Sequence, residues 1–153
     1  MDALKGGFGK MMVTERLALL KNLMQQYGID YYYIPTNDFH GSEYVADYFK
    51  CREYMSGFTG SAGNMLVSQS ETGLWTDGRY FLQAEEQLAG SGITLFRMGE
   101  PGVPKIFEYI AQHIQPGQCL GFDGRMVDAF YALQLKKIVE GKGARLVTDY
   151  DLV

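Results

Sequence analysis

The chain has 153 residues, a length that suits one domain with a buried core. Its formal net charge of −4 mixes 14 basic with 18 acidic side chains, which gives no basic stripe for a nucleic acid. No apolar run approaches the roughly 20 residues that cross a bilayer, and the first residues lack the apolar centre of a secretory signal, so we expect a cytoplasmic protein without nucleic-acid or membrane partners.

The start of the chain divides into a leader and a helix. Residues 1–13 contain three glycines and no apolar period, and we expect them to form a loose leader ahead of a single domain at residues 14–153. Thr14 is a suitable N-cap, and apolar residues follow at helical spacing until Gly28, which predicts an amphipathic helix. The apolar face of this helix comprises Leu17, Leu20, Met24 and Tyr27.

A strand, a polar loop and a glycine-rich loop follow. The aromatic run at residues 31–34 favours a strand packed on both faces, and this strand ends at Pro35. The loop after it contains His40, which could line a cleft or brace the loop with a hydrogen bond. Residues 42–54 have a helical pattern. The segment 56–63 has glycines at every third position, which predicts an irregular, closely packed loop.

A hairpin and a capped helix are predicted next. Residues 64–68 and 74–76 are short apolar strands separated by turn residues. Asp77 has the chemistry of an N-cap for a helix that stops at Gly90. Arg79 therefore lies at an exposed corner between a strand and a helix.

The rest of the chain alternates between strands and helices. Apolar spacing predicts strands at residues 93–98, 119–122 and 144–148, and helices at residues 105–114 and 127–139. This alternation, opened by one hairpin, favours an α/β fold. We expect a three-layer sandwich in which a mixed sheet of about six strands carries helices on its faces.

The residues argue against two kinds of site. The glycine-rich loop could cradle a phosphate, but it leads into a strand and lacks the Gly-Lys-Ser/Thr of a phosphate loop. His40 and His113 are the only histidines, and no carboxylates cluster with them at ligand spacing. We therefore expect no catalytic residue and no metal site in this chain. His113, at the end of a predicted helix, is interpreted as a packing residue.

Arg79 and Phe58 each allow two interpretations. An arginine fork can hold a peptide carbonyl or carboxylate by paired hydrogen bonds, and its charge persists at any working pH. The alternative for Arg79 is a surface ion pair with Asp77 or Glu85. Phe58, inside the glycine-rich loop, either fills the local core or faces another domain.

Two motifs, SGFTGSAG at residues 56–63 and LWTDGRYF at residues 74–81, carry a resemblance to a known family. At this separation they resemble the N-terminal domain of cytosolic-type Xaa-Pro aminopeptidases (aminopeptidase P), within the creatinase/prolidase family. The match extends upstream over Pro35 and His40 and downstream to residues 121–123, and so covers nearly the whole chain after the leader. The family's N-terminal domain is a three-layer α/β sandwich, in agreement with the predicted elements.

The resemblance implies a non-catalytic role for this chain. In the family, two divalent ions, here expected to be manganese, are bound by a C-terminal pita-bread catalytic domain that these residues do not include, so the chain alone is expected to be inactive. The resemblance assigns Arg79 to the substrate region and places His40 at the same cleft. The implied partners are the catalytic domain of the same polypeptide, a peptide with proline in second position, and a second copy of the parent enzyme in a homodimer.

One departure and one alternative accompany the resemblance. Relatives commonly carry two adjacent arginines before the glycine-rich loop, where this chain has Cys51 and Arg52, so only Arg52 can serve a role shared by such a pair. The alternative function is a stand-alone binding or interaction module with the same fold and no enzymatic partner domain. A reading frame that continues past Val153 into a catalytic domain would favour the enzyme, and a stop codon there would favour the module.

Overall fold

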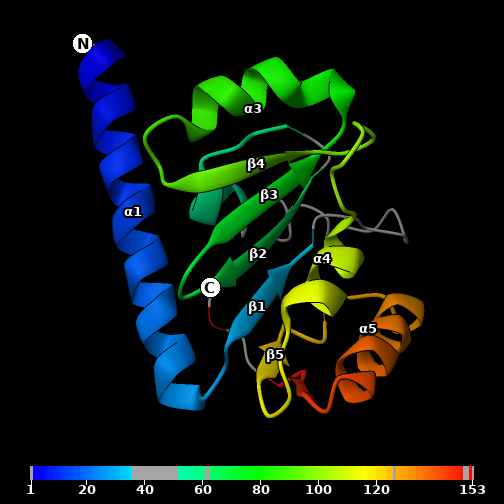
Figure 1. Ribbon diagram of the computed structural model, residues 1–153. Helices are drawn as coiled ribbons and strands as arrows, with labels where there is room; N and C mark the ends of the chain where they lie inside the picture. Colours follow the sequence, from blue (N-terminus) through cyan, green and yellow to red (C-terminus); the bar gives the residue numbers. More distant parts are fainter. Residues whose placement is uncertain (1, 36–51, 61–62, 126, 150–151, 153) are drawn as a thin grey trace.

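A single mixed sheet is the centre of the fold (Figure 1). The computed structural model describes residues 2–35, 52–60, 63–125, 127–149 and 152, with side chains from residue 13 onward. Within these ranges the sheet has six strands in the order β4-β3-β2-β1-β5-β6. The strands are β1 (Tyr31–Ile34), β2 (Asn64–Ser68), β3 (Thr72–Thr76), β4 (Ile93–Arg97), β5 (Cys119–Gly121) and β6 (Arg145–Val147).

One strand runs against the others. β2 is antiparallel to both of its neighbours, β1 and β3, whereas the remaining neighbouring strands are parallel. Five strands therefore end at one edge of the sheet, where β2 begins, and we call it the carboxyl edge. In open α/β sheets ligands bind outside the carboxyl ends of the strands. The residues just beyond these strand ends are thus the first place to look for a site.

Helices cover both faces of the sheet (Figure 1). α1 and α3 pack on one face, and α4 and α5 pack on the other. The helices are α1 (Asp2–Tyr27), the short 3₁₀ helix η1 (Gly78–Tyr80), α3 (Phe81–Leu88), α4 (Ile106–His113) and α5 (Ala129–Gly141), and residues 52–56 are also helical. This arrangement confirms the predicted three-layer α/β sandwich with a mixed six-stranded sheet.

Strand side chains alternate between two cores, as the period of two in a strand requires. On β1, Tyr32 and Ile34 pack into the core beneath α1 and α3, which we call the first core. Tyr33 points to the other face and packs into the core beneath α4 and α5, the second core. A strand buried on both faces explains the unbroken aromatic run in the sequence. Among the described residues, no helix is both long and apolar enough to cross a membrane.

The first helix differs from the expectation drawn from the sequence. Residues 1–13 were predicted to be a loose leader, whereas α1 begins at Asp2 and continues unbroken to Tyr27. Three glycines each cost about 1 kcal/mol in a helix interior, but the alanine, leucine, lysines and methionines on either side of them are strong helix formers. The end of α1 agrees with the prediction, because Gly28 has the positive φ of 70° that terminates helices.

Candidate functional site

Asp77 and Arg79 form a clasp at the carboxyl edge, just beyond β3. An Asp77 carboxylate oxygen, Oδ1, accepts the backbone N–H of Arg79 at 3.0 Å and so caps η1. The guanidinium of Arg79 turns back on the same carboxylate, with Nε donating to Oδ1 at 3.0 Å and Nη2 to Oδ2 at 2.9 Å. Such side-on pairing fixes the orientation of the fork. Asp77 is therefore an N-cap, as predicted, but it caps η1, and α3 begins after this turn at Phe81.

The clasp is charged and exposed. The Arg79 side chain retains 70% of its accessible surface. Hydrogen bonds from Arg79 lower the pKa of Asp77, and the same contacts raise the pKa of Arg79, so both groups stay ionised across the working range of pH. Of the two ion-pair partners considered for Arg79, Asp77 holds it, while Glu85 pairs with Arg97. Arg79 thus presents an oriented fork to its surroundings while it is paired at its base.

The same clasp occurs a second time, just beyond β5, in residues 123–125. Arg125 donates its backbone N–H and its Nε to Asp123 Oδ1, both at 3.0 Å, and its Nη2 to Oδ2 at 2.6 Å. Burial alone would raise the pKa of Asp123, but the hydrogen bonds from Arg125 hold that pKa below its ordinary value. A Cβ on Gly124 would lie 2.9 Å from the carbonyl oxygen of Thr148, so this turn requires glycine.

The second clasp was missed in the sequence, although its signal is plain. Asp-Gly-Arg occurs twice, at residues 77–79 and 123–125, each time directly after a predicted strand. Because β3 and β5 run in the same direction, the two clasps lie on the same edge of the sheet. The carboxyl edge therefore carries two exposed arginine forks, each paired with its own aspartate.

The glycine-rich loop is organised by a buried arginine. Arg52 is completely buried, and its guanidinium donates to the carbonyl oxygens of Gly60 and Gly63 while lying 4.8 Å from the centre of the Phe58 ring. Phe58 is itself completely buried in the first core. Of its two interpretations, the structure therefore supports the packing one. Ser56 completes the turn, since its hydroxyl accepts the N–H of Phe58 at 3.0 Å.

This loop is joined to the first clasp through aromatic and polar contacts. The ring of Tyr80, next to Arg79 in the sequence, packs edge-on against Phe58 with ring centres 6.1 Å apart. Thr59 donates its N–H to the side-chain oxygen of Gln87 on α3 at 2.9 Å. The two sequence motifs are thus brought together in space, and the packing of one supports the position of the other.

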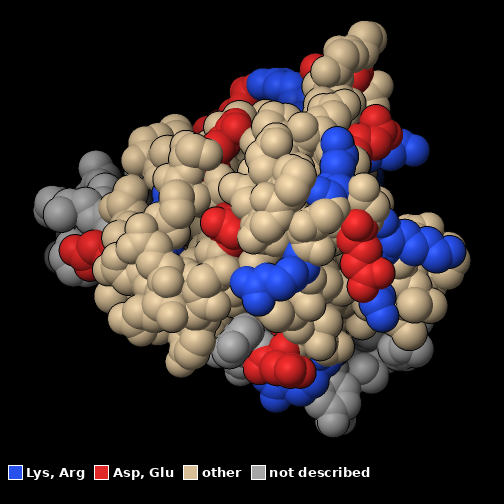
Figure 2. Space-filling view, turned by 60° about the horizontal axis from the view of Figure 1, so that its bottom comes forward, with Lys and Arg blue, Asp and Glu red and all other residues tan. Residues whose placement is uncertain are grey.

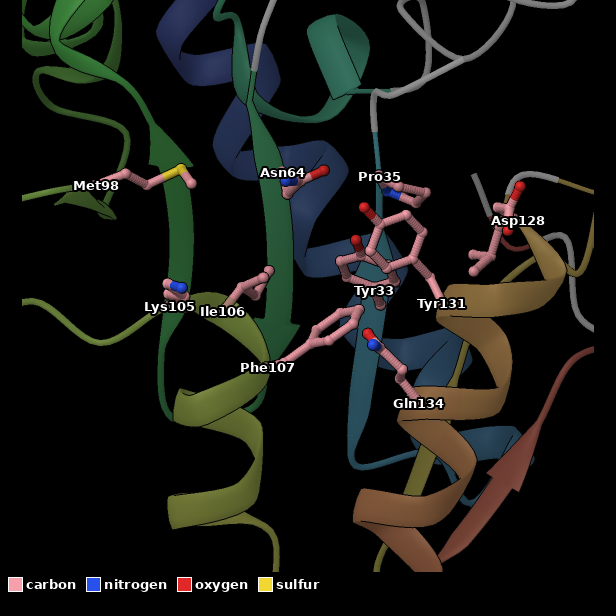
Figure 3. Close-up of a pocket in the computed structure, with 11 residues that line it drawn as sticks. Tyr33, Pro35, Asn64, Met98, Lys105, Ile106, Phe107, Asp128, Tyr131 and Gln134 are labelled. Atoms are coloured by element: carbon pink, nitrogen blue, oxygen red, sulfur yellow. The ribbon is translucent and has the colours of Figure 1, made fainter. Parts of the chain in front are cut away.

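A pocket of about 460 Å³ opens at the carboxyl edge on the other face of the sheet (Figure 3). It lies between the first turns of α4 and α5, next to the end of β1 and the beginning of β2. Phe107 from α4 points toward Tyr131 and Gln134 from α5, and Tyr33 lies between the two helices. The buried part of the lining, which includes Tyr33, Ile106 and Phe107, belongs to the second core, whereas Tyr80 and Phe58 belong to the first. The pocket is therefore separate from the glycine-rich loop.

The structure describes only one of the two histidines. His40 lies outside the described residues, and its placement at a cleft stays a prediction. His113 lies at the end of α4, where its ring stacks on Tyr109 with centres 3.9 Å apart and its Nδ1 is 2.8 Å from the Tyr109 carbonyl oxygen. These contacts agree with its interpretation as a packing residue.

Charge and metal-binding chemistry add little to this site. Figure 2 shows basic and acidic side chains lying side by side over the face in view. In the part of the chain that the structure describes, no three His, Cys, Asp or Glu side chains lie close enough to hold a metal ion. The described residues therefore do not fit a di-metal centre.

Comparison with known protein sequences gives one family. The model of the creatinase/prolidase N-terminal domain matches residues 16–150. Aminopeptidase P2 of Arabidopsis thaliana is 45% identical over 145 residues, which cover 94% of this chain and 20% of that protein. A probable Xaa-Pro aminopeptidase P of Penicillium rubens is 40% identical over 139 residues, which cover 91% of this chain and 22% of that protein. The chain thus spans about a fifth of the length of these curated relatives.

Solved structures with the same fold include whole enzymes and isolated domains. The X-prolyl aminopeptidase of Caenorhabditis elegans, described as a cytosolic enzyme with a di-nuclear active site, matches with a TM-score of 0.82 and 30% identity over 93% of this chain and 25% of its own. The N-terminal domain of the cytoplasmic peptidase PepQ of Mycobacterium tuberculosis matches with a TM-score of 0.61 and 26% identity over 88% of this chain and 93% of its own. The resemblance drawn from the two motifs is confirmed.

Proposed function

The chain belongs to the creatinase/prolidase N-terminal domain family, and from this premise we propose that it is the non-catalytic N-terminal domain of an Xaa-Pro aminopeptidase. The parent enzyme removes the first residue from peptides whose second residue is proline. Support comes from relatives with that activity in their names, of which the chain spans about a fifth. The remainder of such a polypeptide supplies the catalytic domain.

The domain's role is to restrict access to the catalytic cleft and to help place the substrate. The observation that carries this proposal is the exposed fork of Arg79, held by Asp77 at the edge of the sheet where sites form. A guanidinium held in this way can donate to a peptide carbonyl or carboxylate without first losing the freedom of its side chain. His40 is proposed to line the same cleft.

The metal chemistry is assigned to the rest of the polypeptide. A solved relative is described with a di-nuclear active site, and the described residues of this chain do not fit one. We propose that two divalent ions, expected to be manganese, would be bound by residues of the catalytic domain and would supply Lewis-acid chemistry there. The same parent is proposed to be cytoplasmic and to form a homodimer to which this domain contributes contacts.

The test is the Arg79→Ala substitution in the full-length enzyme. We expect kcat/KM for a peptide with proline second to fall about tenfold or more, while the melting temperature stays within about 2 °C of the parent, because the side chain is exposed. Arg97→Ala, which removes another ion-paired arginine from the same domain, is the matched control and should leave kcat/KM unchanged. Equal activity of the Arg79 variant, or a large loss of its stability, would count against a substrate role.

A coding-sequence comparison separates this proposal from a stand-alone binding module. The proposal expects the reading frame to continue past Val153 into a segment with two Asp, one His and two Glu metal ligands. A stop codon directly after Val153 would support the module instead.

A further inference from the structure

The pocket between α4 and α5 has a floor and walls of aromatic rings. Tyr33 and Phe107 meet edge to face with ring centres 5.9 Å apart, and Phe107 meets Tyr131 in the same way at 5.9 Å. Tyr33 is buried in the sheet, so the cluster rests on a rigid strand. The volume of the pocket, about 460 Å³, lies within the range of small-ligand sites, roughly 300–1,000 Å³. The rings together leave apolar surfaces at an opening that also contains polar groups.

Two charged side chains of opposite sign lie on opposite sides of the pocket (Figure 3). Lys105 enters the lining from the start of α4, and Asp128 enters it from the start of α5, with the aromatic rings between them. The Oδ1 atom of Asp128 also caps α5 by accepting the N–H of Phe130 at 2.7 Å. The side-chain amides of Asn64 and Gln134 lie in the same lining. An ammonium at one end, a carboxylate at the other and amides between them match the charges and hydrogen-bonding groups of a short peptide with free ends.

We propose that this pocket binds a short peptide that contains proline, with its carboxylate toward Lys105, its ammonium toward Asp128 and its proline ring on the aromatic cluster. Aromatic-lined grooves are known receptors of proline-rich segments, because proline presents a compact apolar ring and loses little conformational entropy on binding. The choice of proline rests on the proposed function, whereas the fit to a charged peptide rests on the pocket alone.

The experiment titrates this 153-residue chain with Ala-Pro-Ala and, separately, with Ala-Ala-Ala, and follows binding by calorimetry and by amide chemical shifts. We expect saturable binding of Ala-Pro-Ala with a dissociation constant on the order of 0.1–1 mM and at least about fivefold weaker binding of Ala-Ala-Ala. Tyr131→Ala should weaken Ala-Pro-Ala binding about fivefold or more. Leu133→Ala, an exposed residue of the same helix outside the lining, is the control and should leave the affinity unchanged.

A charge reversal tests the orientation without disturbing the core. Lys105 is exposed, so Lys105→Glu should fold normally. We expect it to weaken Ala-Pro-Ala about fivefold and to leave Ala-Pro-Ala with an amidated C-terminus within about twofold of its affinity for the unchanged chain. An equal effect on both peptides would overturn the assigned orientation.

Other occupants of the pocket give different results. No binding of Ala-Pro-Ala up to several millimolar, or binding unchanged by Tyr131→Ala, would overturn the proposal. A dimer in solution that Tyr131→Ala converts to monomer, with no peptide binding, would show that a second copy covers the pocket and would also overturn it. Equal affinity for Ala-Ala-Ala would overturn the proposed preference of the pocket for proline. None of these results depends on kcat/KM of the Arg79 variant, so failure here is distinguishable from failure of the proposed function.

Discussion

The guanidinium carbon of Arg52 lies 4.8 Å from the centre of the Phe58 ring, and both side chains are completely buried. The same guanidinium donates to the carbonyls of Gly60 and Gly63, so one cation serves both the ring and the backbone of the loop. Burial lowers the pKa of Arg52 to about 10, which leaves it charged at neutral pH. The glycine-rich loop is therefore folded around a buried charge.

Replacement of Arg52 by methionine should lower the free energy of unfolding by about 2–4 kcal/mol. Methionine can fill much of the volume, but the buried carbonyls of Gly60 and Gly63 would lose their donors. Urea unfolding followed by circular dichroism measures the change. Arg97→Met, at a partly exposed ion pair, should stay within about 0.5–1 kcal/mol of the parent. A variant at position 52 as stable as the parent would show that the charge is dispensable to the loop.

Gly60→Ala should destabilise the domain by about 1–3 kcal/mol. An added Cβ at this position would lie 2.3 Å from the Phe58 ring, so the ring or the loop has to move. Gly141→Ala is the matched change, because nothing lies within 4 Å of its Cβ position at the end of α5, and it should be neutral or stabilising by up to about 1 kcal/mol. Thermal unfolding of both variants compares them. Similar melting temperatures for the two alanine variants would contradict the close packing of the loop.

Asp123→Asn should remove part of the acid sensitivity of the fold. The hydrogen bonds from Arg125 outweigh burial and lower the pKa of Asp123 below its ordinary value of 3.8. The unfolded chain therefore takes up this proton at a higher pH than the folded protein, so the contribution to stability is complete above pH 3.8 and is lost as the pH falls through the lowered pKa. Unfolding free energies of the parent and the variant should differ most near neutral pH and converge in acid. A constant difference down to about pH 3 would argue against this linkage.

Asp77→Ala tests whether a fixed fork matters, since it leaves the charge of Arg79 in place. In the full-length enzyme we expect a fall in kcat/KM of about fivefold, because the freed guanidinium has to be ordered when substrate binds. Asp77→Asn retains an oxygen that can cap η1 and accept from Arg79, and it should recover part of the loss. Steady-state kinetics of the two variants decide the point. If the alanine variant matched the parent, orientation by Asp77 would have no role in substrate placement.

Local sequence patterns predicted most of the elements but few of the contacts. The aromatic run 31–34, the hairpin and the cap at Asp77 each follow from short-range preferences, and all agree with the structure. The predicted start of the first helix, at Thr14, was wrong because the helix propensity of the residues around the three glycines outweighs the cost of the glycines. Phe58 could not be assigned from its neighbours in the sequence, since its burial depends on Arg52 and Tyr80 packing against it from other elements.

The candidate sites depend on long-range assembly to different degrees. The motif predicts Arg79 as a site residue, which stays a prediction, and the structure shows its ion pair with Asp77, one of the two alternatives. The clasp at residues 123–125 could have been found from the repeated triplet alone. The pocket could not, because its lining comes from segments as distant as Tyr33 and Gln134, and only the packing of α4 and α5 on the sheet brings them together.

Arg79 and Arg125, the two exposed arginines described at the carboxyl edge, are each ion-paired with a neighbouring aspartate. This pairing affects how the domain associates with other molecules. A cation neutralised by a neighbour within 3 Å projects little field beyond a Debye length, so long-range steering of acidic molecules toward this edge should be weak. Encounter rates should then change little with ionic strength, and selectivity would arise only once surfaces touch and water is displaced.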